Sequence, residues 1–218
     1  MAIQSYKVVW KGGEAEITEK KSRFIAHVAP AETEEEALAF IEEIKKKYWD
    51  ARHNCTAYSI GIDQPILRCS DDGEPSKTAG MPMMEVLQGE GLHNVVAVVT
   101  RYFGGTLLGT GGLIRAYTKS TQEGIKNCQI ITKRLGKRME VRCDYSTSGK
   151  IQYVAASGSV PILDTQYTDE VAFDIVVPMD LVGKIKKDFM EASGGKAAIK
   201  EIGEGYFAEI DGEIKILS

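Results

Sequence analysis

The sequence predicts an α+β protein built from two domains. At 218 residues the chain is longer than most single domains, and it can bury hydrophobic cores without disulfides or metal ions. The order of predicted strands and helices changes near Gly136. Basic and acidic residues are equal in number up to that point, so the net charge of −4 arises entirely after it. We therefore expect a first domain at residues 1–136 and a second at residues 137–218.

The composition favours a soluble cytoplasmic protein. Its charge excludes a strongly basic tail for nucleic acids. The four cysteines form no Cys-x-x-Cys pair and no signal peptide is recognisable, which indicates reduced thiols in the cytoplasm. The apolar runs are much shorter than the roughly 20 residues that span a bilayer. We expect no membrane partner, no cofactor and no metal ion.

The first domain opens with strands and an amphipathic helix. Residues 6–10 form a predicted strand, and Gly12-Gly13 is expected to turn the chain back into a second strand within residues 14–28. Thr33 caps the helix and Glu36 completes a capping box. Apolar residues spaced by four, three and four positions form its buried stripe: Ala37, Ile41, Ile44 and Tyr48.

The rest of the first domain alternates strands with helices. Pro82 belongs in a first helical turn, so a helix is expected from residues 78–80 to about residue 88. The β-branched run at residues 95–99 indicates a strand covered on both faces. Further strands are expected at residues 54–62, 66–70 and 129–135, and a long helix at residues 112–127.

The second domain has a different element order. Its predicted elements alternate as strand, helix, strand, strand, helix, strand at residues 138–144, 147–157, 161–167, 170–177, 181–192 and 198–210. This order is typical of a ferredoxin-like sandwich. It contains no histidine and only scattered carboxylates, which favours a binding or orienting module over a catalytic one.

Two glycine-rich loops in the first domain lead directly into helices, an arrangement that suits anions. At the first helix, the amides of Thr78, Ala79 and Gly80 are expected to attract a phosphate or carboxylate. Around the second loop, predicted phosphate donors are Gly104, Gly105, Gly111 and Gly112, with Arg101 leaving its strand nearby. Tight turns without a ligand are the alternative.

The helix after the second loop carries cations on one face. Arg115, Lys119, Gln122 and Lys126 are spaced by four, three and four residues, while Ile114, Tyr117, Thr121 and Ile125 are expected on the buried side. A solvated face is the default explanation of this pattern. With Arg101 it forms a candidate polyanion groove, in which Tyr102 and Phe103 either stack on bases or belong to the core.

Catalytic signals are weak. Asp71, Asp72 and Glu74 could hold magnesium or act as an acid-base pair, but carboxylates around Gly73 and before Pro75 are also what a polar turn selects. Glu74 is the catalytic candidate. No histidine has the spacing of a zinc site.

Three motifs, SDDGEPSKTAGMP, VVAVVTRYFGG and LGTGGLIRAY, resemble the signature of the IMPACT family in its bacterial YigZ/YvyE-like, two-domain branch. The resemblance implies an N-terminal α+β domain similar to domain IV of elongation factor G and to the protein subunit of ribonuclease P. It implies a ferredoxin-like C-terminal domain similar to domain V of that factor. A role in translation follows: eukaryotic relatives regulate a kinase of an initiation factor, and bacterial members are linked to RNA or ribosome binding.

The carried-over signature residues are Asp71, Asp72, Gly73, Glu74, Pro75, Thr78, Ala79, Gly80, Pro82, Arg101, Tyr102, Gly104, Gly105, Gly109, Gly111, Gly112 and Tyr117. Two positions depart from the family pattern. Lys77 stands where the family usually has glycine, and Met81 where it often has a basic residue.

The leading hypothesis is therefore a non-enzymatic regulator linked to translation, which binds structured RNA or the ribosome through the first domain. A translation-regulating protein is a further candidate partner, and sequence-specific DNA binding is not expected. The alternatives are a small hydrolase or phosphotransferase with Glu74 as its base, or a regulator that binds only proteins.

Overall fold

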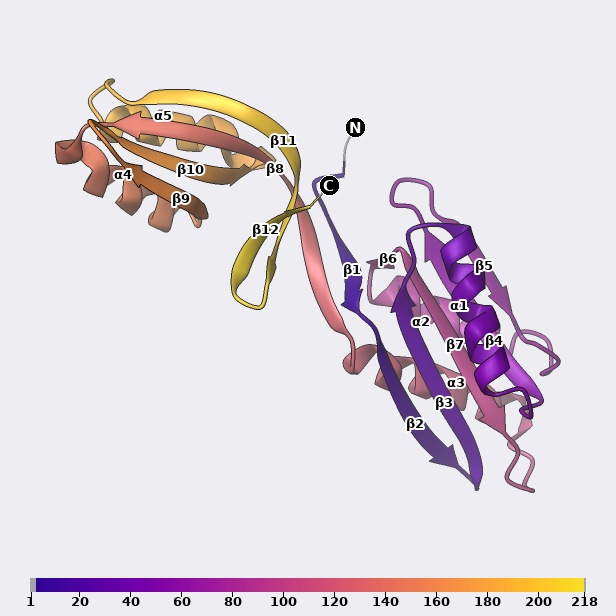
Figure 1. The fold of residues 1–218 in the computed structure, drawn as a ribbon. Helices are drawn as coiled ribbons and strands as arrows, with labels where there is room; N and C mark the ends of the chain where they lie inside the picture. Colours follow the sequence, from indigo (N-terminus) through magenta and orange to yellow (C-terminus); the bar gives the residue numbers. More distant parts are fainter. Residues whose placement is uncertain (1–2, 218) are drawn as a thin grey trace. The chain divides into compact units, whose positions relative to one another are not determined.

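The computed structural model describes residues 3–217 and divides them into two compact units (Figure 1). One unit comprises Tyr6–Ile131, and the other comprises residues 132–217 together with residues 3–5. The division falls inside a single strand, β8 (Gln129–Cys143), where two separate strands were expected. Gly136 lies within this strand, and a Cβ there would come 2.6 Å from the Phe207 ring, so this glycine permits close packing and is not part of a linker. The domain boundary at Gly136 stays a prediction.

The first unit is a five-stranded antiparallel sheet with helices on both faces. The strand order is β2 (Gly13–Glu19), β3 (Ser22–Pro30), β7 (Val95–Tyr102), β4 (His53–Ile60) and β5 (Ile66–Ser70). Helix α1 (Glu34–Lys47) packs on β4 and β7 on one face. Helices α2 (Gly80–Gly89) and α3 (Gly109–Lys126) cover the other face (Figure 1).

The central strand β7 explains the continuous apolar run of the sequence. Residues 95–99 are all buried, because one core lies between the sheet and α1 and a second between the sheet and α2 and α3. A strand buried on both faces selects apolar residues at every position, and here all but Ala97 are β-branched. In the register of the sheet, His53 on β4 lies opposite Arg101 on β7.

The predicted hairpin at Gly12-Gly13 is wrong. Strand β1 (Ser5–Lys11) instead pairs in parallel with the short strand β6 (Leu92–His93), and the hairpin joins β2 to β3 through Lys20 and Lys21, both with positive φ. A Cβ at Gly12 would come 2.6 Å from the Val28 carbonyl oxygen, and one at Gly13 would come 2.5 Å from Asn127. These glycines permit close backbone approach.

Helix α1 begins as its capping pattern predicts. The Thr33 hydroxyl accepts a hydrogen bond from the Glu36 amide, and the Glu36 carboxylate accepts one from the Glu32 amide. Its stripe is buried at Ala37, Ile41 and Ile44. Helix α3 begins three residues earlier than predicted, at Gly109, and its Ile114 is exposed although it was expected in the core.

The second unit has the predicted β-α-β-β-α-β order. It runs β8, α4 (Tyr145–Ser157), β9 (Ile162–Tyr167), β10 (Val171–Pro178), the single turn η1 (Met179–Leu181), α5 (Val182–Ala192) and β11 (Ala198–Ile210), followed by β12 (Glu213–Leu217). Strand β8 pairs antiparallel with both β10 and β11, and β9 pairs with β10, which is the arrangement of a ferredoxin-like sandwich. The similarity to elongation factor G stays a prediction.

Within residues 3–217, the helices are too short or too polar to cross a bilayer.

Candidate functional site

The outer face of α3 presents the predicted cations to solvent. Arg115, Lys119, Gln122 and Lys126 are all exposed, and Lys126 alone of them forms an ion pair with a described residue, at 2.7 Å from Glu123. Exposed pairs of this kind contribute little, so Lys126 remains available to another anion. We call Lys20, Arg115, Lys119 and Lys126 the α3 cation face.

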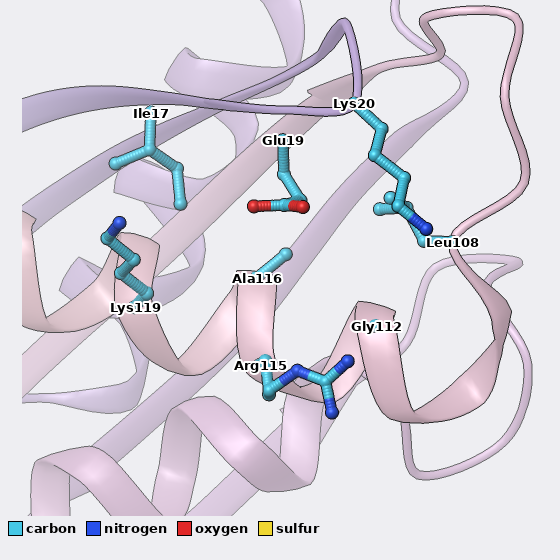
Figure 2. Close-up of a pocket in the computed structure, with 8 residues that line it drawn as sticks. All are labelled: Ile17, Glu19, Lys20, Leu108, Gly112, Arg115, Ala116 and Lys119. Carbon is cyan, nitrogen blue, oxygen red and sulfur yellow. The ribbon is translucent and has the colours of Figure 1, made fainter.

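Lys20 joins this face from the turn between β2 and β3. With Arg115 and Lys119 it lines a hollow of about 210 Å³, whose floor is formed by Ile17, Leu108, Gly112 and Ala116. Figure 2 shows the Glu19 carboxylate among these side chains. Three cations surround one carboxylate, so the hollow keeps a positive excess.

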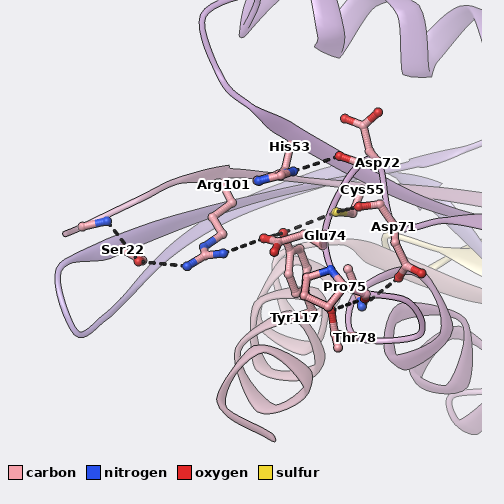
Figure 3. Close-up of polar contacts among 12 residues, drawn as sticks. Ser22, His53, Cys55, Asp71, Asp72, Glu74, Pro75, Thr78, Arg101 and Tyr117 are labelled. Atoms are coloured by element: carbon pink, nitrogen blue, oxygen red, sulfur yellow. Dashed lines mark hydrogen bonds and ion pairs between the residues drawn. The ribbon is translucent and has the colours of Figure 1, made fainter. Parts of the chain in front are cut away.

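Arg101 does not belong to the α3 cation face, contrary to the prediction. Its side chain is buried, with its Nη1 2.7 Å from Glu74 Oε1 and its Nη2 3.4 Å from the Ser22 hydroxyl (Figure 3). The guanidinium also lies over the rings of Phe24 and Phe103. Its charge is compensated inside the protein.

Glu74 is held by the same network. Its Oε1 accepts from Arg101 and from the Tyr117 hydroxyl, which lies at 2.9 Å. The Cys55 sulfur lies 3.3 Å from the Tyr117 oxygen. Burial raises the pKa of the Tyr117 hydroxyl and of the Cys55 thiol well above their usual values, so both are neutral at neutral pH. Glu74 is thus the counter-ion of a buried cation, which explains it without catalysis.

The N-terminus of α2 already holds an anion, and it is part of the protein. Asp71 Oδ1 accepts from the amides of Ala79 at 3.0 Å and Gly80 at 2.9 Å, and its Oδ2 accepts from the Lys77 amide at 2.7 Å. The Thr78 hydroxyl donates to the Pro75 carbonyl. The expected external phosphate at these amides is therefore replaced by an internal carboxylate.

The acidic loop that supplies Asp71 is a tight turn. The Glu74 amide donates to the Asp71 carbonyl at 2.9 Å, and Asp72 and Gly73 both have positive φ, as a type I′ turn requires. The Asp72 carboxylate accepts from the Asn54 amide at 2.6 Å. No group of three or more His, Cys, Asp or Glu between residues 3 and 217 is arranged to hold a metal ion.

The glycines of the second loop have two different roles. The Gly104 amide donates to the Ser22 hydroxyl, and a Cβ at Gly104 would come 2.0 Å from the Lys21 backbone, so this glycine serves a close approach. Gly105 has φ +82°, which glycine adopts without strain. Gly111 and Gly112 lie in the first turn of α3, where amides have no intrahelical acceptor.

A cleft opens beside that first turn, with a volume of about 440 Å³. Its polar lining comes from Arg52, His53, Glu74, Arg101 and Thr110, together with Gly109. Its apolar lining comes from Pro75, Phe103, Leu107, Leu108 and Leu113. We call this the α3 N-terminal cleft.

Sequence reasoning missed Arg52 and His53 as lining residues. His53 reaches the cleft because β4 pairs with β7 and places it opposite Arg101, a register that no local pattern reveals. Phe103, which was expected either to stack on bases or to belong to the core, is 53% exposed. Tyr102 is only half-buried, and its hydroxyl donates to Asp50 at 2.7 Å.

Comparisons with known proteins decide the family. Residues 20–125 match the model described as "Impact N-terminal domain", and residues 141–196 match "Domain of unknown function (DUF1949)". The "IMPACT family member YvyE" of Bacillus subtilis (strain 168) is 43% identical over 199 residues, which cover 91% of this chain and 92% of the relative. The chain belongs to the IMPACT family.

Two further matches extend across both units of this IMPACT family member. The "IMPACT family member YigZ" of Escherichia coli (strain K12) is 35% identical, covering 85% of this chain and 92% of the relative. A solved structure titled "Crystal structure of an hypothetical protein" is 31% identical, with a TM-score of 0.59, covering 93% of this chain and 99% of that one. The two-domain α+β fold is therefore shared with a solved protein.

Proposed function

We propose that this IMPACT family member is a cytoplasmic regulator of translation that binds structured RNA or the ribosome through the α3 cation face, while the second unit orients it. Family membership supports the link to translation, which the signature motifs imply. The observation that carries the binding surface is the set of exposed cations on α3.

The charges of this face are free to meet phosphates. Lys20, Arg115 and Lys119 form no ion pair with any residue between 3 and 217, and nearby Glu19 offsets only one of them. Cations that are not already paired release the counterions of a nucleic acid on binding, which drives association. Arg101, in contrast, is paired with Glu74 and contributes no net charge.

The spacing of the cations on this face suits contacts with a phosphate backbone and not the reading of a base sequence. Positions 115 to 126 span about 16 Å along the helix at 1.5 Å per residue. Long, flexible cations along one helix contact phosphates, which fix position but carry no sequence information. We infer recognition of RNA shape, without sequence-specific DNA binding.

Co-sedimentation with purified ribosomes at low and high salt tests the proposal. The Arg115→Glu, Lys119→Glu double variant should remain in the supernatant at low salt, where the parent sediments with the ribosomes. The matched control is Lys45→Glu, Lys46→Glu on α1, which changes the charge equally but lies on the opposite face of the sheet. Retention of the α3 double variant at every salt concentration would favour a regulator that binds only proteins.

A further inference from the structure

The α3 N-terminal cleft has the build of a small-ligand site. Its volume of about 440 Å³ lies within the range of pockets for small molecules, and its apolar walls carry a few polar groups, as such pockets do. All its lining residues belong to the first unit. The four residues of the α3 cation face do not line this cleft, although Leu108 lines both the cleft and the hollow beside that face.

The first turn of α3 supplies unused donors at one side of the cleft. Leu108 is the N-cap, no side chain caps the helix, and no acidic residue lies in the first turn. Among the described residues, the amides of Gly109, Thr110, Gly111 and Gly112 have no hydrogen-bond acceptor. Amides at the start of an 18-residue helix favour an anion through both hydrogen bonds and the helix dipole.

Arg101 provides an independent sign of a missing ligand atom. It lines the cleft and exposes only 7% of its surface, yet its buried Nε has no hydrogen-bond partner. Its Nη1 and Nη2 are committed to Glu74 and Ser22. Buried donors are rarely left unsatisfied, since each costs free energy, and the cleft is the space from which an acceptor can approach the Arg101 side chain.

His53 and Arg52 add adjustable polar groups. The His53 Nδ1 lies 2.9 Å from the Asp72 carbonyl oxygen, which can only accept, so Nδ1 carries the proton. Its Nε2 is then free to accept a hydrogen bond when the ring is neutral. Arg52 is exposed and forms no ion pair with a described residue. Glu74 compensates the charge of Arg101. The cleft therefore has a positive excess, which comes from Arg52 and from the helix dipole.

The apolar wall selects the rest of the ligand. Phe103 is 53% exposed and Leu107 is 84% exposed, and both line the cleft, so a ligand there would cover apolar surface. A planar ring can stack on Phe103 beside the Arg101 guanidinium, which already lies 5.7 Å from the centre of that ring. The occupant therefore combines an oxyanion with a flat aromatic body.

We propose that the α3 N-terminal cleft binds a nucleoside 5′-monophosphate group, with its phosphate on the amides of residues 109–112 and its base against Phe103. The group comes either from a free nucleotide or from the 5′ end of an RNA. The proposal does not rest on RNA binding by the α3 cation face.

NMR titration with AMP, adenosine and inorganic phosphate tests it on the full chain. AMP should shift the amides of residues 109–112 and the ring signals of Phe103, and adenosine should bind at least tenfold more weakly because it lacks the phosphate. A titration in which millimolar AMP leaves both groups of signals unchanged overturns the proposal. So does equal binding of adenosine and AMP.

Thr110→Asp is the decisive variant. A carboxylate in the first turn suits the helix dipole, so the fold should persist, but it repels phosphate and should weaken AMP binding at least tenfold. Phe103→Ala should weaken it about tenfold through lost stacking. The matched control Gln122→Glu adds one negative charge on the same helix away from the cleft and should leave AMP affinity unchanged. Undiminished AMP binding by Thr110→Asp would contradict the site.

Two oligoribonucleotides distinguish the sources of the nucleotide. A 5′-phosphorylated tetranucleotide that binds more tightly than AMP, and more tightly than its 5′-hydroxyl form, identifies the end of an RNA as the ligand. Tighter binding of AMP than of both oligonucleotides identifies a free nucleotide. Binding of the 5′-hydroxyl and 5′-phosphorylated forms with equal affinity at the cleft would contradict the phosphate contact.

Discussion

The guanidinium of Arg101 and the carboxylate of Glu74 form a buried ion pair 2.7 Å long, with side-chain exposures of 8% and 4%. The pair joins the acidic turn after β5 to the central strand β7. Such pairs add little net stability, but removal of one partner leaves an uncompensated charge. Two signature motifs are thus linked by electrostatics inside the fold.

Glu74→Gln should therefore lower the stability of the fold, because the role of Glu74 is structural. Loss of the carboxylate leaves Arg101 buried without a counter-ion, and the free energy of unfolding should fall by about 3–5 kcal/mol. Urea denaturation measures the change. Glu123→Gln, which breaks the exposed pair with Lys126, is the control and should cost about 0.5 kcal/mol or less. Equal, small effects of the two variants would show that the buried pair does not hold the motifs together.

Asp71→Ala should free the backbone amides at the N-terminus of α2. Three amides lose their acceptor, so stability should fall by about 1–2 kcal/mol. The vacated amides should then accept sulfate or phosphate, raising the melting temperature of the variant more than that of the parent. A parent protein whose Ala79 and Gly80 amides respond to phosphate as strongly as those of the variant would contradict the internal cap.

Two glycines should respond oppositely to alanine. Gly104→Ala places a Cβ 2.0 Å from the Lys21 backbone, which cannot yield, so the variant should be strongly destabilised or fail to fold. Gly149 lies on the exposed side of α4, and a Cβ added there would meet no neighbouring atom within 4 Å. Gly149→Ala should therefore stabilise the protein by about 0.5–1 kcal/mol. Thermal melts compare them. A Gly104→Ala variant as stable as the parent would remove the close approach as its explanation.

Glu201 should confer acid sensitivity on the second unit. Hydrogen bonds from Lys137 and Lys186 hold the pKa of its exposed carboxyl at about 2, below the ordinary 4.5. The folded-state pKa is lowered, so the stability from these contacts is fully present above pH 4.5 and is lost as pH falls through about 2. Salt should reduce this contribution, because the group is exposed.

Urea midpoints of the parent and of Glu201→Gln between pH 7 and pH 2 measure this effect. The parent should be the more stable above pH 4.5, and the difference should vanish toward pH 2. A difference that stays constant over the whole range would show that the carboxylate charge is not its source.

The sequence predicted elements whose signals are local. Thr33 and Glu36 mark the start of α1, and the β-branched run at residues 95–99 marks a strand buried on both faces. Long-range pairing was not predictable in the same way. The parallel pairing of β1 with β6 joins distant segments, and Gly12-Gly13 carries the same signal as a hairpin turn although it serves backbone packing.

The candidate site shows the same limit. The exposed face of α3 followed from helical spacing, because Arg115, Lys119 and Lys126 lie on one helix. The carboxylate of Asp71 caps α2 from a turn six to nine residues away, and Glu74 neutralises Arg101 from 27 residues away. Neither partnership has a periodic signal, so both helix amides and arginine were predicted to be free.

The salt dependence of RNA binding tests the central claim most directly. Affinity for a structured RNA fragment is measured across salt concentrations for the parent, Arg115→Ala, Lys119→Ala and the control Lys46→Ala. Each α3 variant should reduce the slope of log affinity against log salt by about 0.7–0.9, because one phosphate contact is lost, while Lys46→Ala leaves the slope unchanged. Identical slopes for all four proteins would contradict the account and assign the α3 cation face to solvent.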